Sequence, residues 1–331
     1  MSHTNVADFE FGFDDSPDTA SDEIVPETWN TQSSRQLEVA QRKAHSPATQ
    51  PQGYQLIAPP WLPSTDGTSG QPPFRPASPQ SWLAPVPPLP PNLPAGRLLS
   101  ELAVVYMPVI AAYSTRPVAH EALVRSAAAP QSDGRAIIDA VATGGMLPQL
   151  GAAVRCAVAA NLALTRDASL VFVNVEEADL DDGSLGSPND PLTAYASRVV
   201  FDLSLARFDR PIPDHCQRID WLRRRGFRFA LDDFGASAVG YSELSALNPE
   251  FVKVGASLTD HLCDTPGVPG LLATIARVCA SRNMVLVAKA IGRRSDYHAA
   301  AAAGVPWLSG WHVGHPVASL GDIGNALNRR A

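Results

Sequence analysis

Acidic side chains close several short apolar stretches in the second two-thirds of the chain. Glu121 lies within one such stretch, Asp202 ends another, Asp232 and Asp233 follow a third, and Asn174 lies at the end of a fourth. Carboxylate and amide oxygens suit Mg²⁺, Mn²⁺ or Ca²⁺ better than zinc. Four carboxylates brought together would repel one another unless a cation lay between them. The pattern therefore predicts a divalent-cation site, provided that the fold gathers these residues.

The elements that must position these residues are short strands alternating with amphipathic helices. The predicted strands span residues 103–109, 118–123, 170–175, 199–203, 227–231, 251–254, 285–288 and 307–310. Apolar strands separated by helices indicate a mostly parallel sheet that is covered on its faces. Eight of them in this length predict an α/β fold, a (β/α)8 TIM-like barrel, in which polar residues at the carboxyl ends of strands meet at one mouth.

A different composition precedes this part of the chain. The first 30 residues hold eight carboxylates and no Lys or Arg, and 17 of the 30 prolines lie before residue 95. Such a segment buries too little apolar area to offset its ordering entropy, and a Pro-rich run favours an extended spacer. We therefore expect residues 1–97 to be a disordered acidic and Pro-rich tail and residues 98–331 to be the barrel domain. Phe9, Phe11 and Phe13 in the acidic part could anchor the tail on a protein partner.

Charge and composition exclude several functions. The net charge of −7 argues against DNA or a membrane surface as the main partner. We also expect no membrane-spanning stretch and no secretory signal. Cys156, Cys216, Cys263 and Cys279 are scattered without a CxxC pair, which argues against a zinc knuckle or a disulfide scaffold. These features predict a cytoplasmic protein.

Several motifs together resemble one family. Residues 121–125 (Glu-Ala-Leu-Val-Arg) are similar to the signature of EAL domains, the cyclic di-GMP phosphodiesterase family. The resemblance runs from residue 101 to 317. Residues 232–235 match the Asp-Asp-Phe-Gly motif, Lys253 follows at the family's spacing, Asn174 matches the metal-binding Asn, and residues 310–316 resemble the closing segment. The chain is accordingly identified as a member of the EAL family of barrels.

This resemblance implies a chemistry. In active members, two divalent cations hold a water that attacks one phosphodiester of cyclic di-GMP and gives linear pGpG. One cation would have four ligands, which are Glu121, Asn174, Asp202 and Asp232. Asp233 would hold the second cation together with Asp232, and Lys253 would hold the attacking water or a phosphate oxygen. Arg125 would bind a phosphate of the ligand, with Glu121 and Asp233 also lining the ligand site.

The departures from the family pattern fall mainly on the catalytic part. They are Met107, Asp202, Leu205, Ser237, Lys289, Gly292 and Ser309. Lys289 stands where the family has its proposed general base, and an ammonium cannot accept a proton from water. It would also repel a nearby dication by roughly 5–8 kcal/mol before screening. The second cation site is therefore predicted to be weakened or absent, unless Lys289 turns outward. Lys289 could instead pair with Asp233 and replace the missing cation electrostatically.

Together these features predict a degenerate EAL-domain protein that acts in cyclic di-GMP signalling and is not an enzyme. It would be a nucleotide receptor or a protein-interaction module, with Mg²⁺ or Mn²⁺ at one site. Its partners would be cyclic di-GMP and a protein bound through residues 1–97 or the barrel surface, and pairing of two copies stays open. The alternative is an active metal-dependent phosphodiesterase that gives pGpG.

Overall fold

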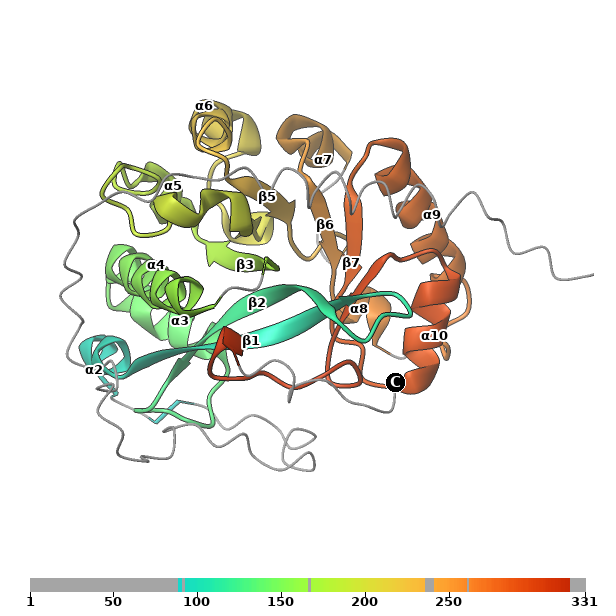
Figure 1. The fold of residues 1–331 in the computed structure, drawn as a ribbon, viewed down its shortest axis with the longest axis horizontal. Helices are drawn as coiled ribbons and strands as arrows, with labels where there is room; N and C mark the ends of the chain where they lie inside the picture. Colours follow the sequence, from blue (N-terminus) through green and yellow to red (C-terminus); the bar gives the residue numbers. More distant parts are fainter. Residues whose placement is uncertain (1–88, 91–92, 166–167, 236–240, 261, 322–331) are drawn as a thin grey trace, which may run out of the picture. The chain divides into compact units, whose positions relative to one another are not determined.

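The computed structural model describes residues 89–90, 93–165, 168–235, 241–260 and 262–321, which form a closed barrel of eight strands (Figure 1). The strands neighbour one another in chain order. They are β1 (Leu102–Ala111), β2 (Pro117–Ser126), β3 (Leu170–Val175), β4 (Val199–Leu203), β5 (Arg228–Leu231), β6 (Phe251–Val254), β7 (Val285–Ala288) and β8 (Trp307–Ser309). The predicted TIM-like barrel is confirmed, and the predicted strand ends differ from these by up to three residues.

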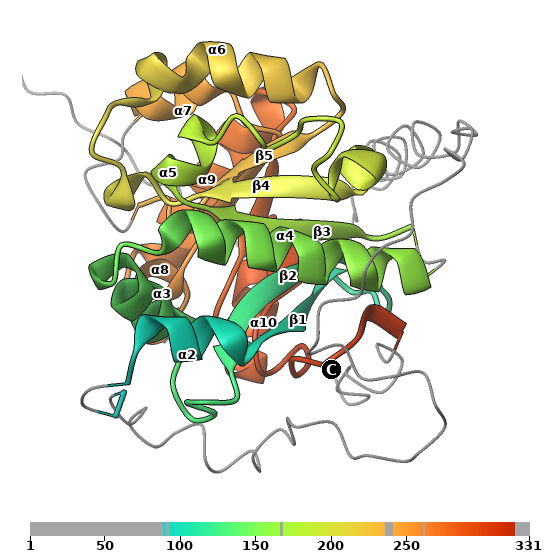
Figure 2. The same ribbon diagram turned by 90° about the vertical axis from the view of Figure 1, so that its left-hand side faces the viewer.

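Helices surround the barrel and connect most of its strands. The α-helices are α2 (Ala95–Ser100), α3 (Gly134–Thr143), α4 (Leu147–Leu164), α5 (Glu177–Asp181), α6 (Ile212–Arg223), α7 (Tyr241–Leu247), α8 (Ala256–Thr259), α9 (Val268–Ser281) and α10 (Arg294–Ala302). Two short 3₁₀ helices flank β4, namely η2 (Thr193–Arg198) and η3 (Leu205–Arg207). Figure 2 shows α4 running along the outside of β2 and β3.

The first strand departs from the all-parallel arrangement. β1 pairs antiparallel with β2 on one side and with β8 on the other, whereas the remaining neighbours are parallel. Residues 112–116, which join β1 to β2, are too few to form the crossover that parallel neighbours need. Tyr113 takes a φ of 62° in this turn. The mouth formed by the carboxyl ends of β2 to β8 is therefore lined by the beginning of β1.

A layer of apolar side chains fills the inside of the barrel. It takes one residue from each of the first seven strands, which are Val109, Ala119, Phe172, Val200, Ala230, Phe251 and Val287. The rings of Phe172 and Phe251 meet edge to face at 5.2 Å, and Trp307 of β8 packs on Phe251 at the same distance. Side chains of this size close a barrel of eight strands, so its interior is a packed core and not a pore.

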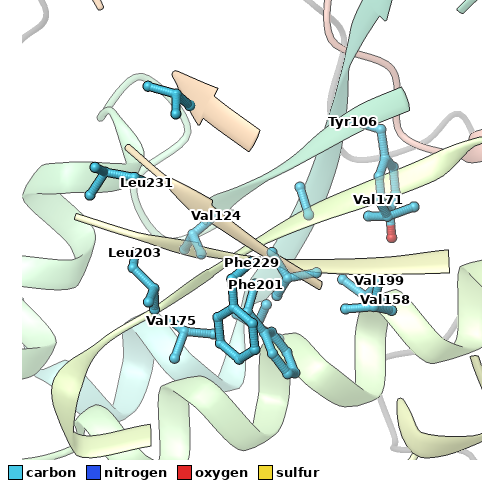
Figure 3. Packing of buried hydrophobic residues seen from close by; sticks show 14 of the residues in the cluster. Tyr106, Val124, Val158, Val171, Val175, Val199, Phe201, Leu203, Phe229 and Leu231 are labelled. Atoms are coloured by element: carbon cyan, nitrogen blue, oxygen red, sulfur yellow. The ribbon is translucent and has the colours of Figure 1, made fainter. Parts of the chain in front are cut away.

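The residues that alternate with this layer point outward against the helices. Phe201 of β4 stacks on Phe227 at 4.6 Å and lies 5.8 Å from Phe229 of β5. Figure 3 shows Phe201 and Phe229 beside one another among the buried residues that also include Val158 of α4. Strand β4 and the end of β5 are consequently apolar on both faces, which explains the uninterrupted apolar stretches in the sequence.

Helix α4 is long and apolar enough to cross a bilayer by length and composition, with a mean hydropathy of 1.3 over 18 residues. In the barrel it packs along the strands and buries Leu150, Val154, Val158 and Leu162. Arg155 of the same helix is buried and forms ion pairs with three aspartates. The buried stripe is that of a core helix in this fold.

Most of the predicted tail lies outside the described residues. The boundary drawn between residues 97 and 98 falls inside α2, which begins at Ala95 directly after Pro94. Proline before the first turn is compatible with a helix start, and Leu98 is fully buried against the barrel. Residues 95–97 therefore belong to the barrel domain.

Candidate functional site: a polar layer at the mouth of the barrel

A layer of polar side chains lies directly above the apolar layer of the barrel. Each of its members comes two residues after a member of the apolar layer, and two of them, Asp232 and Lys289, directly follow the last residue of their strand. A spacing of two keeps both residues on one side of the strand. We call this set the polar layer: Glu121, Asn174, Asp202, Asp232, Lys253 and Lys289. The apolar interior thus brings together residues that are up to 168 positions apart in the sequence.

Three carboxylates converge within the polar layer. One oxygen from each of Glu121, Asp202 and Asp232 lies within 4.8 Å of the others. Their residues are at most 8% exposed. Asn174 lies beside Asp202 in the register of β3 and β4, so its amide belongs to the same end of the sheet. Parallel pairing positions all of these at the carboxyl ends of the strands.

Lys253 of β6 is buried among these carboxylates. Its Nζ lies 3.0 Å from Glu121 Oε1, donates to Asp202 Oδ2, and stands 5.0 Å from the ring centre of Phe172 in the apolar layer below. Burial would lower the pKa of Lys253, but attraction to Asp202 and Glu121 outweighs it and raises that pKa above its usual range. Lys253 is therefore an ammonium that holds two of the three carboxylates in place.

Lys289 follows β7 and binds the other side of the layer. Its Nζ lies 2.5 Å from Asp232 Oδ1 and 3.0 Å from Asp233 Oδ1. Its backbone N–H donates to the Val254 carbonyl at 2.8 Å, and its carbonyl accepts from Thr259 Oγ1 at 2.6 Å. The side chain is thus fixed at both ends. Of the two orientations that the sequence left open, the structure shows the inward one, paired with Asp233.

The backbone is unusual on both sides of the ion pair between Lys289 and Asp233. Asp233 has a φ of 51° and Ala290, directly after Lys289, has a φ of 58°. Both lie in the left-handed region that residues other than glycine rarely adopt. Gly255 leaves the room that the pair needs, since a Cβ there would come 2.6 Å from Asp233 Oδ1. Strained backbone of this kind persists at positions where a site is built.

The two buried aspartates of the layer differ in acidity. Burial, reinforced by the charge of Asp232, raises the pKa of Asp202 to about 8 despite the attraction of Lys253. Burial would also raise the pKa of Asp232, but the ammonium groups of Lys253 and Lys289 lower it below its ordinary value. Asp232, which touches Lys289, is therefore the more firmly ionised of the two.

The donor set fits one divalent cation. Its ligands are oxygens, and Asp202 Oδ1 is buried without a hydrogen-bond partner among the described residues. A cation among Glu121, Asp202 and Asp232, with Asn174 beside them, would meet that acceptor. The second position implied by the EAL resemblance does not fit a cation, because the Nζ of Lys289 lies against both Asp232 and Asp233.

Other predicted residues lie around the layer. Arg125, four residues beyond Glu121 on β2, donates from Nη1 to the Val124 carbonyl at 2.7 Å. Among the described residues it forms no hydrogen bond or ion pair with the carboxylates of the layer, although it lies within the electrostatic reach of Glu121. Met107 is buried opposite Glu121 in the pairing of β1 and β2. The other residues that differ from the EAL family pattern do not gather at one place. Leu205 is buried in η3, Gly292 is exposed, and Ser309 Oγ donates to the Pro108 carbonyl. Ser237 lies outside the described residues.

A second polar cluster at the same end of the barrel was not foreseen. The loops after β3 and β4 border a hollow of about 380 Å³. Arg207 pairs with Glu176 at 3.1 Å, and Arg210 pairs with Glu177 at 2.6 Å. The signal was present, since both glutamates follow a strand end as the site residues do. Their ion pairs are with arginines 31 and 33 positions away, so no local sequence pattern indicates which residues pair.

The closed barrel with polar residues at the carboxyl ends of its strands defines a TIM-like protein. The EAL domain family matches residues 93–316 of the chain. The match covers more than half of the chain, and the chain belongs to the EAL domain family.

Curated relatives share a shorter segment with this chain. Cyclic di-GMP phosphodiesterase PdeB of Shewanella oneidensis is 27% identical over 95 residues, which are 29% of this chain and 11% of that protein. Cyclic di-GMP phosphodiesterase PdeF of Escherichia coli K12 is 23% identical over 95 residues, or 29% of this chain and 13% of that protein. The chain thus spans a small part of the length of these relatives.

Solved structures share the fold over most of the barrel. BlrP1 of Klebsiella pneumoniae, in a complex with manganese and cyclic di-GMP, has a TM-score of 0.59 at 19% identity over 70% of this chain and 57% of that one. A standalone EAL protein of Vibrio cholerae O395 in its c-di-GMP-bound form has a TM-score of 0.56 at 20% identity over 66% and 93%. At these identities the likeness concerns the fold.

Proposed function

We propose that this protein is a receptor for cyclic di-GMP that binds the dinucleotide at the polar layer without hydrolysing it. Membership of the EAL family supports the ligand class, as do the cyclic di-GMP complexes among the proteins that share the fold. The residues of the polar layer support the position of the site. Their ammonium groups and one bound cation would attract the two phosphodiesters of the ligand.

The observation that carries the proposal is the ion pair of Lys289 with Asp232 and Asp233. Hydrolysis of a phosphodiester requires a group that takes a proton from the attacking water. The ammonium of Lys289 has no lone pair to accept one, and Asp233 is engaged by that ammonium. The arrangement can hold an anion, but it lacks the base at the position where the resemblance puts it.

Two other functions each have an observation in their favour. The cluster of Glu121, Asp202 and Asp232 is kept, which favours an active metal-dependent phosphodiesterase that gives pGpG. The burial of Met107 and the hydrogen bond that engages Arg125 with the Val124 carbonyl favour a barrel that has lost the nucleotide and binds a protein. The proposed receptor role accounts for both the retained cluster and Lys289.

One experiment separates the three functions. The full chain is titrated with cyclic di-GMP in Mn²⁺ by calorimetry, and the nucleotides are then separated by chromatography. The proposal predicts binding with the dinucleotide recovered intact. Formation of pGpG at an enzyme-like rate would establish the phosphodiesterase, whereas no heat would leave the protein-binding module.

Matched variants locate the binding. Asp232→Asn changes a buried aspartate of the polar layer and should weaken binding at least tenfold. Asp220→Asn changes an aspartate of α6 whose side chain is 59% exposed, so its affinity should equal that of the wild type. Equal weakening in both variants would contradict binding at the polar layer.

A further inference from the structure

We propose that Lys289 is a built-in cation, so that the polar layer binds one divalent ion and not two. The inference rests on the proposed function in taking the polar layer as the ligand site, but the number of ions is a separate property. It concerns how many cations this barrel needs to present a site for an anionic ligand.

The contacts of Lys289 occupy the place of an ion. Its Nζ lies 2.5 Å from Asp232 Oδ1 and 3.0 Å from Asp233 Oδ1, so it uses one oxygen of each carboxylate that a second cation would need. The side chain is 18% exposed and its backbone is hydrogen-bonded to Val254 and Thr259. These contacts tether the positive charge to the barrel.

Composition points to a specific use of lysine here. The chain has 26 basic residues, of which three are lysines, namely Lys43, Lys253 and Lys289. Two of the three lie in the polar layer. Lysine carries a compact charge on a flexible stem, and the planar guanidinium of arginine is not a close substitute for a small cation.

The charge of the site indicates that it binds one divalent ion. A carboxylate that binds a cation gives up its proton, so Asp202 is counted here as ionised despite its raised pKa. Asp233 and the polar layer then together hold four carboxylates and two ammonium groups, which leaves two negative charges. One divalent ion neutralises them, and a second would leave two uncompensated positive charges in a buried place. With Glu at position 289, five carboxylates and one ammonium would leave four negative charges, which two divalent ions neutralise.

One acceptor remains for the single ion. Asp202 Oδ1 is buried without a hydrogen-bond partner among the described residues, and Asp202 is 1% exposed. A buried polar atom of this kind needs a partner. Asp202 belongs to the group of Glu121, Asp202 and Asp232, and Lys289 pairs with one member of that group, Asp232. The ion is therefore expected among these three carboxylates.

The test counts Mn²⁺ ions on the full chain. Metal-free protein is titrated with Mn²⁺ in the absence of nucleotide, and free Mn²⁺ is read by electron paramagnetic resonance. The wild type should bind one ion and Lys289→Glu two. Arg277→Glu makes the same change of charge at an exposed position of α9 and should keep one.

Two ions or none on the wild type would overturn the inference, as would a single ion on folded Lys289→Glu. If that variant fails to fold, Asp202→Asn tests the inference instead, because it should bind no Mn²⁺ ion. An unchanged ion count for Asp202→Asn would refute the position of the ion among Glu121, Asp202 and Asp232. Because no nucleotide is present, failure of the proposed receptor role would leave the ion count unaffected. A wild-type chain that binds cyclic di-GMP with two ions would refute only the inference about Lys289.

Discussion

Replacing Lys253 by methionine should show how much the positive charge of Lys253 contributes to the free energy of unfolding. The substitution keeps an unbranched side chain, one atom shorter, but removes the ammonium that lies against Glu121 and Asp202 and over the ring of Phe172. It leaves three carboxylates whose oxygens lie within 4.8 Å of one another. The folded protein would then carry buried like charges with a single ammonium, that of Lys289, to offset them.

The cost follows from this geometry. Two unit charges 4.8 Å apart at an effective dielectric constant of about 20 repel by about 3.5 kcal/mol. Protonation of Asp202, whose pKa burial already raises to about 8, relieves part of this repulsion. Removing one partner of a buried ion pair typically costs about 3–5 kcal/mol, and we expect a value in that range. That is a large fraction of the stability of an ordinary domain.

The assay is urea unfolding followed by circular dichroism in EDTA and again in excess Mn²⁺. In EDTA the variant should unfold at a clearly lower urea concentration than the wild type. Mn²⁺ at about 100 times its dissociation constant should return about 2.7 kcal/mol to either protein. Arg277→Met, at an exposed position, should stay within about 0.5 kcal/mol of the wild type. Equal urea midpoints for Lys253→Met and the wild type in EDTA would refute the stabilisation of the carboxylates by the Lys253 ammonium.

Three further predictions concern the site and its support. Lys289→Glu combined with Leu205→Glu and Gly292→Glu should recover Mn²⁺-dependent formation of pGpG, and a folded but inert triple variant would contradict the assignment of these positions. Burial raises the pKa of Asp179 to about 6, so the folded state binds a proton that the unfolded state has already lost, and the free energy of unfolding falls by up to about 3 kcal/mol as pH rises from about 4 to 6. Asp179→Asn should remove this pH dependence of the urea midpoint, and an unchanged pH dependence would contradict the prediction. Gly310 has a φ of 146°, and a Cβ there would lie 2.2 Å from the Ile291 nitrogen. Gly310→Ala should therefore lower the free energy of unfolding by more than about 3 kcal/mol, measured by thermal unfolding. Gly96→Ala, with open space around the new methyl group, should not destabilise the protein.

The sequence predicted the barrel well because its strands are apolar on both faces and end abruptly. The stretch before Asp232 and the stretch before Lys289 each stop where the side chain leaves the apolar interior for the mouth. The antiparallel direction of β1 was missed, although the short connection after it already excluded a crossover helix. Strand existence follows from local composition, and strand direction depends on what connects the strands.

The site could be predicted in part. The spacing of two residues between Phe172 and Asn174, or between Phe251 and Lys253, is local and fixes which residues reach the mouth. The orientation of Lys289 is not local, since it depends on the positive φ of Ala290 and on bonds to β6 and α8. The sequence could therefore name the two orientations but could not decide between them.

A crystal of the full chain soaked in Mn²⁺ would show how many ions the polar layer binds, because anomalous scattering locates each ion. We expect one manganese among Glu121, Asp202 and Asp232, with the Lys289 ammonium still against Asp233. Two manganese ions with the Lys289 side chain turned out to solvent would contradict it.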